Sequence, residues 1–114
     1  MELIETPIFT KKIVDLLSDD EYGELQWFLA INPEAGPVIP GGGGIRKLRW
    51  SIGGKGKSGG IRIIYYVYAR DAKIYLLLPY KKSKQEDLTK EQLKMLRDYV
   101  KGGVLRRTKI SEIC

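Results

Sequence analysis

Three runs rich in β-branched and aromatic residues predict three consecutive β-strands in the middle of the chain. The runs cover residues 45–52, 61–68 and 73–80, and Gly, Lys or Asp residues bound each of them. Residues 70–72 form a short hairpin link, whereas the Gly/Lys stretch 53–60 forms a longer loop. We therefore expect the chain to be organised around a sheet built from these strands.

Apolar residues at helical spacing predict two helices before the strands. Thr6 and Pro7 indicate the start of the first helix, whose apolar stripe continues to Leu17. Ser18 and Glu21 form a capping box that opens the second helix, which ends near Asn32-Pro33. Residues 3–6 are a candidate for a short edge strand.

A second capping box predicts a helix after the strands. Thr89 and Gln92 open this helix, and the Gly102-Gly103 pair stops it. Its expected inward residues are Leu93, Leu96, Tyr99 and Val100. The order of elements predicts a single α+β domain over residues 1–103, in which an N-terminal helical hairpin packs on an antiparallel-rich curved sheet and a C-terminal helix follows. We expect the helices to cover one face of the sheet and residues 104–114 to form a tail.

The length and composition are typical of one soluble globular domain. The chain has 114 residues, of which 43% are apolar and 30% charged. No apolar run approaches the roughly 20 residues of a membrane span, and the N-terminus lacks the pattern of a signal peptide. The single cysteine is the terminal Cys114, so no intrachain disulfide can form. These features predict a cytoplasmic protein that does not bind a membrane.

Positive charge is concentrated on the predicted sheet. Residues 1–44 carry 2 basic and 8 acidic side chains, residues 45–90 carry 12 and 3, and residues 91–114 carry 6 and 3. Such clustering indicates a surface that binds a polyanion. The alternative is a basic surface that only keeps the protein in solution.

Several classes of site are excluded by residue content. The chain has no histidine and one cysteine, which excludes a His- or Cys-based metal site and a histidine-dependent triad. We therefore expect no metal and no cofactor. The Gly56-Lys57-Ser58 stretch is not a phosphate loop, because Ser51 stands where a glycine is required and a strand follows. We interpret it as a basic loop whose Lys55 and Lys57 contact phosphates.

Strand alternation gathers cations on one face. Lys47 and Arg49 point the same way, and pairing with the next strand would bring Arg62 beside them. Tyr80 and Lys82 join them if the end of the third strand lies next to this strand. A lysine crowded by other cations would lose its proton more readily than usual. The alternative is a solvated polar face of the sheet.

Segments along most of the chain resemble the RelE/ParE superfamily of bacterial toxins, and most closely its HigB-type members. The segments are residues 29–33, 36–41, 44–50, 54–60, 61–66, 80–82 and 87–89. Their order and spacing match over residues 3–101. The resemblance implies the toxin of a type II toxin-antitoxin system. Such a toxin is a ribosome-dependent, metal-independent endoribonuclease that cuts mRNA and inhibits translation.

The resemblance also implies partners and residue roles. The expected partners are a cognate antitoxin that masks the basic face, the ribosome and mRNA. The expected catalytic residues are Lys47 as general base, Arg49 and Arg62 as charge stabilisers, and Lys82 as acid or phosphate clamp. The expected RNA-binding residues are Arg46, Lys55, Lys57, Tyr66, Tyr80 and Lys84. Leu88 stands where some relatives carry a tyrosine, so that base stacking would fall to Tyr66 or Tyr80.

Two other functions remain open at this point. A ParE-like member of the superfamily would poison DNA gyrase through protein contacts. The four cations expected to be catalytic argue against it, namely Lys47, Arg49, Arg62 and Lys82. A non-catalytic RNA-binding module would bind RNA with a steep salt dependence but leave it intact. Cleavage assays with ribosomes distinguish these functions from the nuclease.

Overall fold

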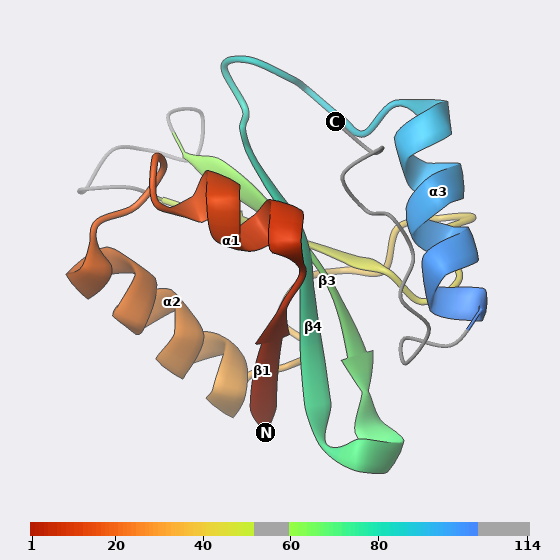
Figure 1. Cartoon of the computed structure of the whole chain (residues 1–114), viewed down its shortest axis with the longest axis horizontal. Coiled ribbons are helices and arrows are strands. Elements are labelled where there is room, and N and C mark those ends of the chain that lie inside the picture. Colours follow the sequence, from red (N-terminus) through yellow and green to blue (C-terminus); the bar gives the residue numbers. More distant parts are fainter. Residues whose placement is uncertain (52–59, 103–114) are drawn as a thin grey trace.

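A four-stranded sheet with helices on both of its faces forms the protein (Figure 1). The computed structural model describes residues 1–51 and 60–102. The elements are β1 (Glu2–Glu5), α1 (Pro7–Ile13), α2 (Asp19–Ile31), β2 (Arg46–Trp50), β3 (Ile61–Tyr68), a short 3-10 helix (Ala69–Asp71), β4 (Lys73–Lys81) and α3 (Lys90–Lys101). The four predicted strands and three predicted helices are therefore all present.

The sheet has the strand order β1-β4-β3-β2 and is mostly antiparallel. The central strand β3 pairs antiparallel with β2 and with β4, whereas β1 pairs parallel with β4 at the edge. A bulge in the β3–β4 ladder falls between Ile64 and Tyr65, which pair with Leu78 and Leu76. Leu77 is the extra residue, and a bulge of this kind bends the strand that carries it. The α+β fold predicted from the sequence is confirmed.

The prediction that the helices cover one face of the sheet is wrong. Helices α1 and α2 pack on one face, where Phe9, Leu25 and Leu29 meet Ile63 and Tyr65. Helix α3 lies on the opposite face, as Figure 1 shows. Its Leu96 belongs to a second core with a different set of residues. This core contains Ile8, Ile45, Ile64, Tyr75, Leu77, Leu78, Tyr80 and Leu96. Both faces of the central strands are buried, which explains why β3 and β4 are almost continuously apolar.

Helix α1 is shorter than its apolar stripe suggests. It ends at Ile13, and the chain continues in tight turns in which the Asp15 and Leu16 N–H groups donate to the carbonyls of Lys12 and Ile13. Leu17 is nevertheless buried beyond the helix end. Both predicted capping boxes are present, at Ser18 for α2 and at Thr89 for α3. No helix in the described residues is both long enough and apolar enough to cross a membrane.

Thr6 joins the N-terminal segment to the last strand. Its hydroxyl donates to the Leu77 carbonyl oxygen at 2.8 Å and accepts from the Phe9 N–H at 3.2 Å, at a site where Thr6 is only 3% exposed. The same hydroxyl therefore caps α1 and satisfies a backbone carbonyl of β4 beyond the reach of β1.

Thr6→Val is expected to lower the free energy of unfolding by about 2 kcal/mol, because it leaves two buried backbone groups without a partner. Urea denaturation measures this change. Thr89→Val removes an exposed cap and is the matched control, with an expected loss of about 1 kcal/mol. Equal losses in the two variants would contradict the role assigned to the bond with Leu77.

Candidate functional site

Cationic side chains from two neighbouring strands lie on the α3 face of the sheet, beyond the second core. Arg49 of β2 is paired with Arg62 of β3, and Arg62 is paired with Tyr80 of β4. Directly paired residues project from the same face, so these three side chains form one row across the sheet. Lys47 lies opposite Ile64 and therefore on the same face, two residues along β2 from Arg49. The convergence that strand alternation predicted is present.

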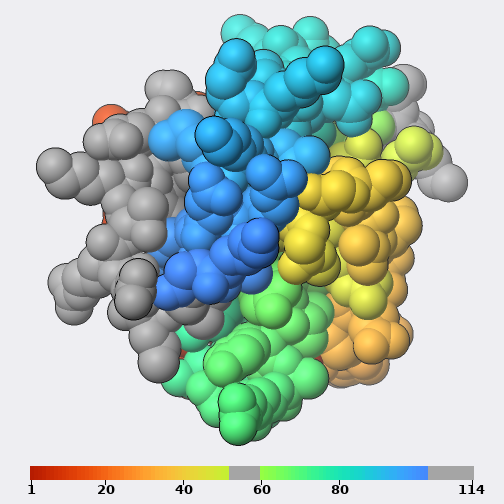
Figure 2. Space-filling view, turned by 90° about the vertical axis from the view of Figure 1, so that its right-hand side faces the viewer, coloured from red at the N-terminus to blue at the C-terminus, as the bar shows by residue number. Residues whose placement is uncertain are grey.

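The segment after β4 completes this surface. Lys82 follows the strand directly, and its N–H donates to the Gly60 carbonyl oxygen at 3.3 Å. We call Lys47, Arg49, Arg62 and Lys82 the cationic patch. Figure 2 shows this face of the molecule, where the segment that follows β4 (cyan) comes next to the yellow-green residues of β2 and early β3.

Arg62 is a buried arginine with no acidic partner in the part of the chain that the structure describes. The residue is 4% exposed, and its Nη1 donates to the Ile61 carbonyl oxygen at 3.3 Å. Within residues 1–51 and 60–102, no carboxylate lies within ion-pair distance of it. A buried charge without a counter-ion is costly to fold. The arrangement therefore favours an anion that arrives from outside.

Tyr80 supplies an unused hydrogen-bond donor in the same row. Its hydroxyl is buried and has no partner in the described part of the chain. Burial raises its pKa to about 12, the charge of Asp87 acts in the same direction, and Arg62 opposes the shift. The phenol therefore stays protonated at neutral pH and keeps a hydrogen-bond donor that no described residue uses.

Asp87 lies among the cations of the patch. Its Oδ1 is 2.8 Å from the Lys47 Nζ, and the two side chains are 73% and 25% exposed. The hydrogen bond and charge of Lys47 lower the pKa of Asp87, and Lys82 and Arg49 contribute in the same direction. Such an exposed pair contributes at most about 1 kcal/mol to stability. While the pair is intact, the Lys47 ammonium is a proton donor rather than a base.

A comparison with protein-family models identifies the family of this chain. A family model described as the RelE toxin of the RelE/RelB toxin-antitoxin system matches residues 38–112, which is more than half of the sequence. The chain belongs to the RelE toxin family. It is thus a toxin of a toxin-antitoxin system, and the family implies a cognate antitoxin as its partner. The match begins after α2 and ends within the segment predicted to be a tail.

Not every predicted RNA-binding residue of this RelE-family toxin lies at the patch. Arg46 projects from the opposite side of β2, where its guanidinium donates to the carbonyl oxygens of Gly36 at 2.8 Å and Glu34 at 3.3 Å. These two hydrogen bonds hold the loop before β2 against the strand. Lys84 lines a separate hollow at the edge of β4. Lys55 and Lys57 lie outside the described residues.

Tyr66 is also distant from the cation row. It lies four residues beyond Arg62 on β3, which corresponds to about 13 Å along a strand. Its ring stacks on that of Tyr68, with 6.5 Å between the ring centroids. Of the two aromatic residues considered for base stacking, Tyr80 is the one in the row, although the residue is only 7% exposed.

Sequence reasoning did not single out Asp87 in this toxin. Periodicity assigns directions to residues within strands and helices, but Asp87 lies in the segment between β4 and α3. The available signal was the position of an acidic residue in a strongly basic segment, two residues before the Thr89 cap.

Tyr80→Phe is expected to stabilise the RelE-family toxin by about 1 kcal/mol, because it removes a buried hydroxyl that has no partner. The stability that depends on Tyr80 is intact below pH 10.0 and is lost as the pH rises towards about 12, since the unfolded chain ionises first. The variant should therefore lose less stability in this interval. Urea denaturation at pH 7, 10 and 11 measures both effects. If the variant and the parent lost the same free energy of unfolding between pH 10 and 11, the burial of this hydroxyl would be contradicted.

Proposed function

We propose that this toxin is a HigB-like, ribosome-dependent endoribonuclease that cuts mRNA and thereby inhibits translation. The buried Arg62 guanidinium supports this proposal, because it lies in one row with Arg49 and Tyr80 and has no counter-ion among the residues that the structure describes. A phosphodiester supplies both the missing negative charge and the missing hydrogen-bond acceptors. Arginine binds phosphate through a planar fork of donors, which suits this task.

The chemistry needs only groups that the patch contains. The 2′-oxygen of one nucleotide attacks the adjacent phosphorus, and the bond from phosphorus to the 5′-oxygen breaks. The products are a 2′,3′-cyclic phosphate and a 5′-hydroxyl. Arg49 and Arg62 stabilise the additional negative charge on the phosphoryl oxygens in the transition state. Lys82, at the end of β4, holds the phosphate or protonates the leaving oxygen.

Proton transfer is assigned to Lys47 together with Asp87. The 2′-hydroxyl loses a proton and the 5′-oxygen gains one, so the site needs an acceptor and a donor. Lys47 is proposed as the base, and it must release its proton or its contact with Asp87 before it accepts another. Displacement of Asp87 by the incoming phosphate would make the lysine available at the moment of binding.

The proposed partners act on the same surface. We place the toxin in the cytoplasm, where it meets ribosomes and mRNA. The cognate antitoxin is proposed to mask the cationic patch, because acidic side chains would neutralise Arg49 and Lys82, which have no ion-pair partner among the described residues. An antitoxin bound there would exclude RNA by occupying the same charges.

Incubation of the purified toxin with ribosomes that carry a defined mRNA tests the proposed function. We expect discrete cuts with 5′-hydroxyl and 2′,3′-cyclic phosphate ends, and intact mRNA when ribosomes are omitted. Arg62→Ala is expected to abolish the cuts while antitoxin binding persists. If mRNA bound to the ribosome stays whole with the unmodified toxin, the nuclease is excluded. Induction of DNA damage in cells would then favour the gyrase poison, and salt-dependent binding without cuts would favour the RNA-binding module.

A further inference from the structure

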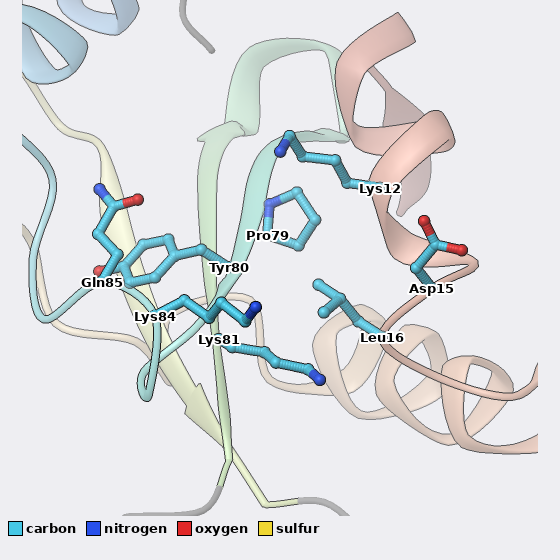
Figure 3. Close-up of a pocket in the computed structure, with 8 residues that line it drawn as sticks. All are labelled: Lys12, Asp15, Leu16, Pro79, Tyr80, Lys81, Lys84 and Gln85. Atoms are coloured by element: carbon cyan, nitrogen blue, oxygen red, sulfur yellow. The ribbon is translucent and has the colours of Figure 1, made fainter.

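A hollow of about 410 Å³ lies at the edge of β4, next to α1 (Figure 3). Strand β1 pairs with β4 only as far as Leu76, so no strand of the described residues lies beside the last residues of β4 on this side. The turn after α1 and the segment after β4 enclose the space that remains. The hollow is therefore a consequence of the short edge strand.

Three lysines line this hollow. Lys12 comes from α1, Lys81 from the end of β4, and Lys84 from the segment that follows. In Figure 3 the amines of Lys12 and Lys84 turn towards β4 from its two sides. One carboxylate, Asp15, also lines the space, and none of the four groups belongs to an ion pair within residues 1–51 and 60–102. The excess of unpaired positive charge favours an anionic ligand.

The hollow adjoins the cationic patch. Tyr80 lines the hollow and is also the strand partner of Arg62. Tyr80 is therefore common to the lining of the hollow and to the row that contains Arg62. A chain molecule with regularly spaced negative charges can occupy both at once, whereas a single small anion cannot.

We propose that this hollow is a second phosphate-binding site, which holds the RNA backbone beside the bond that is cut in the cationic patch. The proposal rests on the proposed nuclease function and names a part of its substrate-binding surface. The ligand is an RNA phosphodiester, supplied either by the mRNA or by ribosomal RNA. Lys12 and Lys81, which sequence reasoning left without a role, become binding residues alongside Lys84.

The test compares two triple variants with the same change in charge. K12A/K81A/K84A removes the amines around the hollow, and K11A/K94A/K101A removes three lysines that do not line it. We expect the first variant to bind mRNA-loaded ribosomes about 10- to 100-fold more weakly. The slope of log affinity against log salt concentration should also become shallower by about 2. Its cleavage rate at saturation should stay within about threefold of the parent, because it leaves Lys47, Arg49 and Arg62 in place. The control should change affinity by less than about threefold.

Asp15→Asn is expected to change the affinity for RNA in the opposite direction. Removal of this carboxylate from the lining should strengthen binding by about two- to fivefold, since it no longer repels phosphate. Thermal melting of each variant confirms that it folds. Equal affinity of the two triple variants, or weaker binding by Asp15→Asn, would overturn the proposal.

Two further measurements identify the source of the phosphate. If the mRNA supplies it, neutral methylphosphonate linkages beside the cut should abolish the difference between the parent and K12A/K81A/K84A. If ribosomal RNA supplies it, the triple variant should bind weakly even to ribosomes without mRNA. Either result supports the hollow as a phosphate site. The parent protein could also bind RNA through these lysines and yet cut nothing. That result would support the second phosphate site and contradict only the nuclease function.

Discussion

Arg62→Met is expected to abolish cleavage and to stabilise the protein at the same time. The methionine fills a similar volume without a charge, at a position where Arg62 is 4% exposed and has no counter-ion among the described residues. Replacement of such a charge typically raises the free energy of unfolding by about 1–3 kcal/mol. In a domain of this size the melting temperature should increase by about 4–12 °C. Cleavage of mRNA on ribosomes should fall by at least about 10³-fold.

Two measurements on the same preparation test this prediction. Thermal melting without RNA gives the stability, and gel analysis of mRNA on ribosomes gives the activity. Arg70→Met is the matched control, because Arg70 is exposed in the turn between β3 and β4. It should change neither quantity appreciably. A destabilised Arg62→Met protein would indicate that the guanidinium serves the fold rather than an external anion.

Lys47→Arg should lower the rate of cleavage by about 10²- to 10⁴-fold. Arginine retains the positive charge and can still pair with Asp87, but it does not exchange a proton at any ordinary pH. The variant therefore separates proton transfer from charge stabilisation. Single-turnover cleavage measures the rate, and the binding of mRNA-loaded ribosomes measures the affinity. We expect the affinity to stay within about threefold of the parent.

Arg49→Lys is the companion variant for this experiment. The position is assigned to charge stabilisation alone, so an ammonium should retain much of the activity, within about 10- to 30-fold of the parent. If Lys47→Arg were as active as Arg49→Lys, Lys47 would be only an electrostatic residue. The base would then have to be sought elsewhere.

The sequence predicted the strands well because side-chain alternation and composition act locally. Strand β3 covers the predicted residues 61–68, and β4 extends only one residue further than expected. The bulge at Leu77 could not be predicted, because it depends on how β3 and β4 align after they meet. Helix α1 was overextended, since the apolar stripe continues into turns that also bury Leu17.

The arrangement of the helices was wrong for a reason that is visible in the strands. Ile63 and Ile64 are adjacent in β3 and both are fully buried, each in a different core. Strands with one solvated face alternate between apolar and polar residues, whereas strands covered on both faces do not. The continuous apolar character of β3 and β4 was therefore a signal for a helix on each side.

Alternation also predicted much of the site. It placed Lys47 and Arg49 on one face, and the register added Arg62. The same rule applied to Arg46 would have put its side chain on the other face, where it binds the loop carbonyls. The position of Asp87 depends on a loop, and loops follow no period that a sequence pattern can reveal. The pairing with Lys47 therefore came only from the tertiary structure.

The parallel pairing of β1 with β4 has a consequence for synthesis of the toxin. The Thr6 bond to Leu77 spans 71 positions, so the N-terminal strand finds its neighbour only after most of the chain exists. Until then the apolar sides of α1 and α2 have no completed sheet to cover, and the row that contains Tyr80 lacks its third strand. The sheet of the toxin is consequently complete only after the last strand has emerged from the exit tunnel.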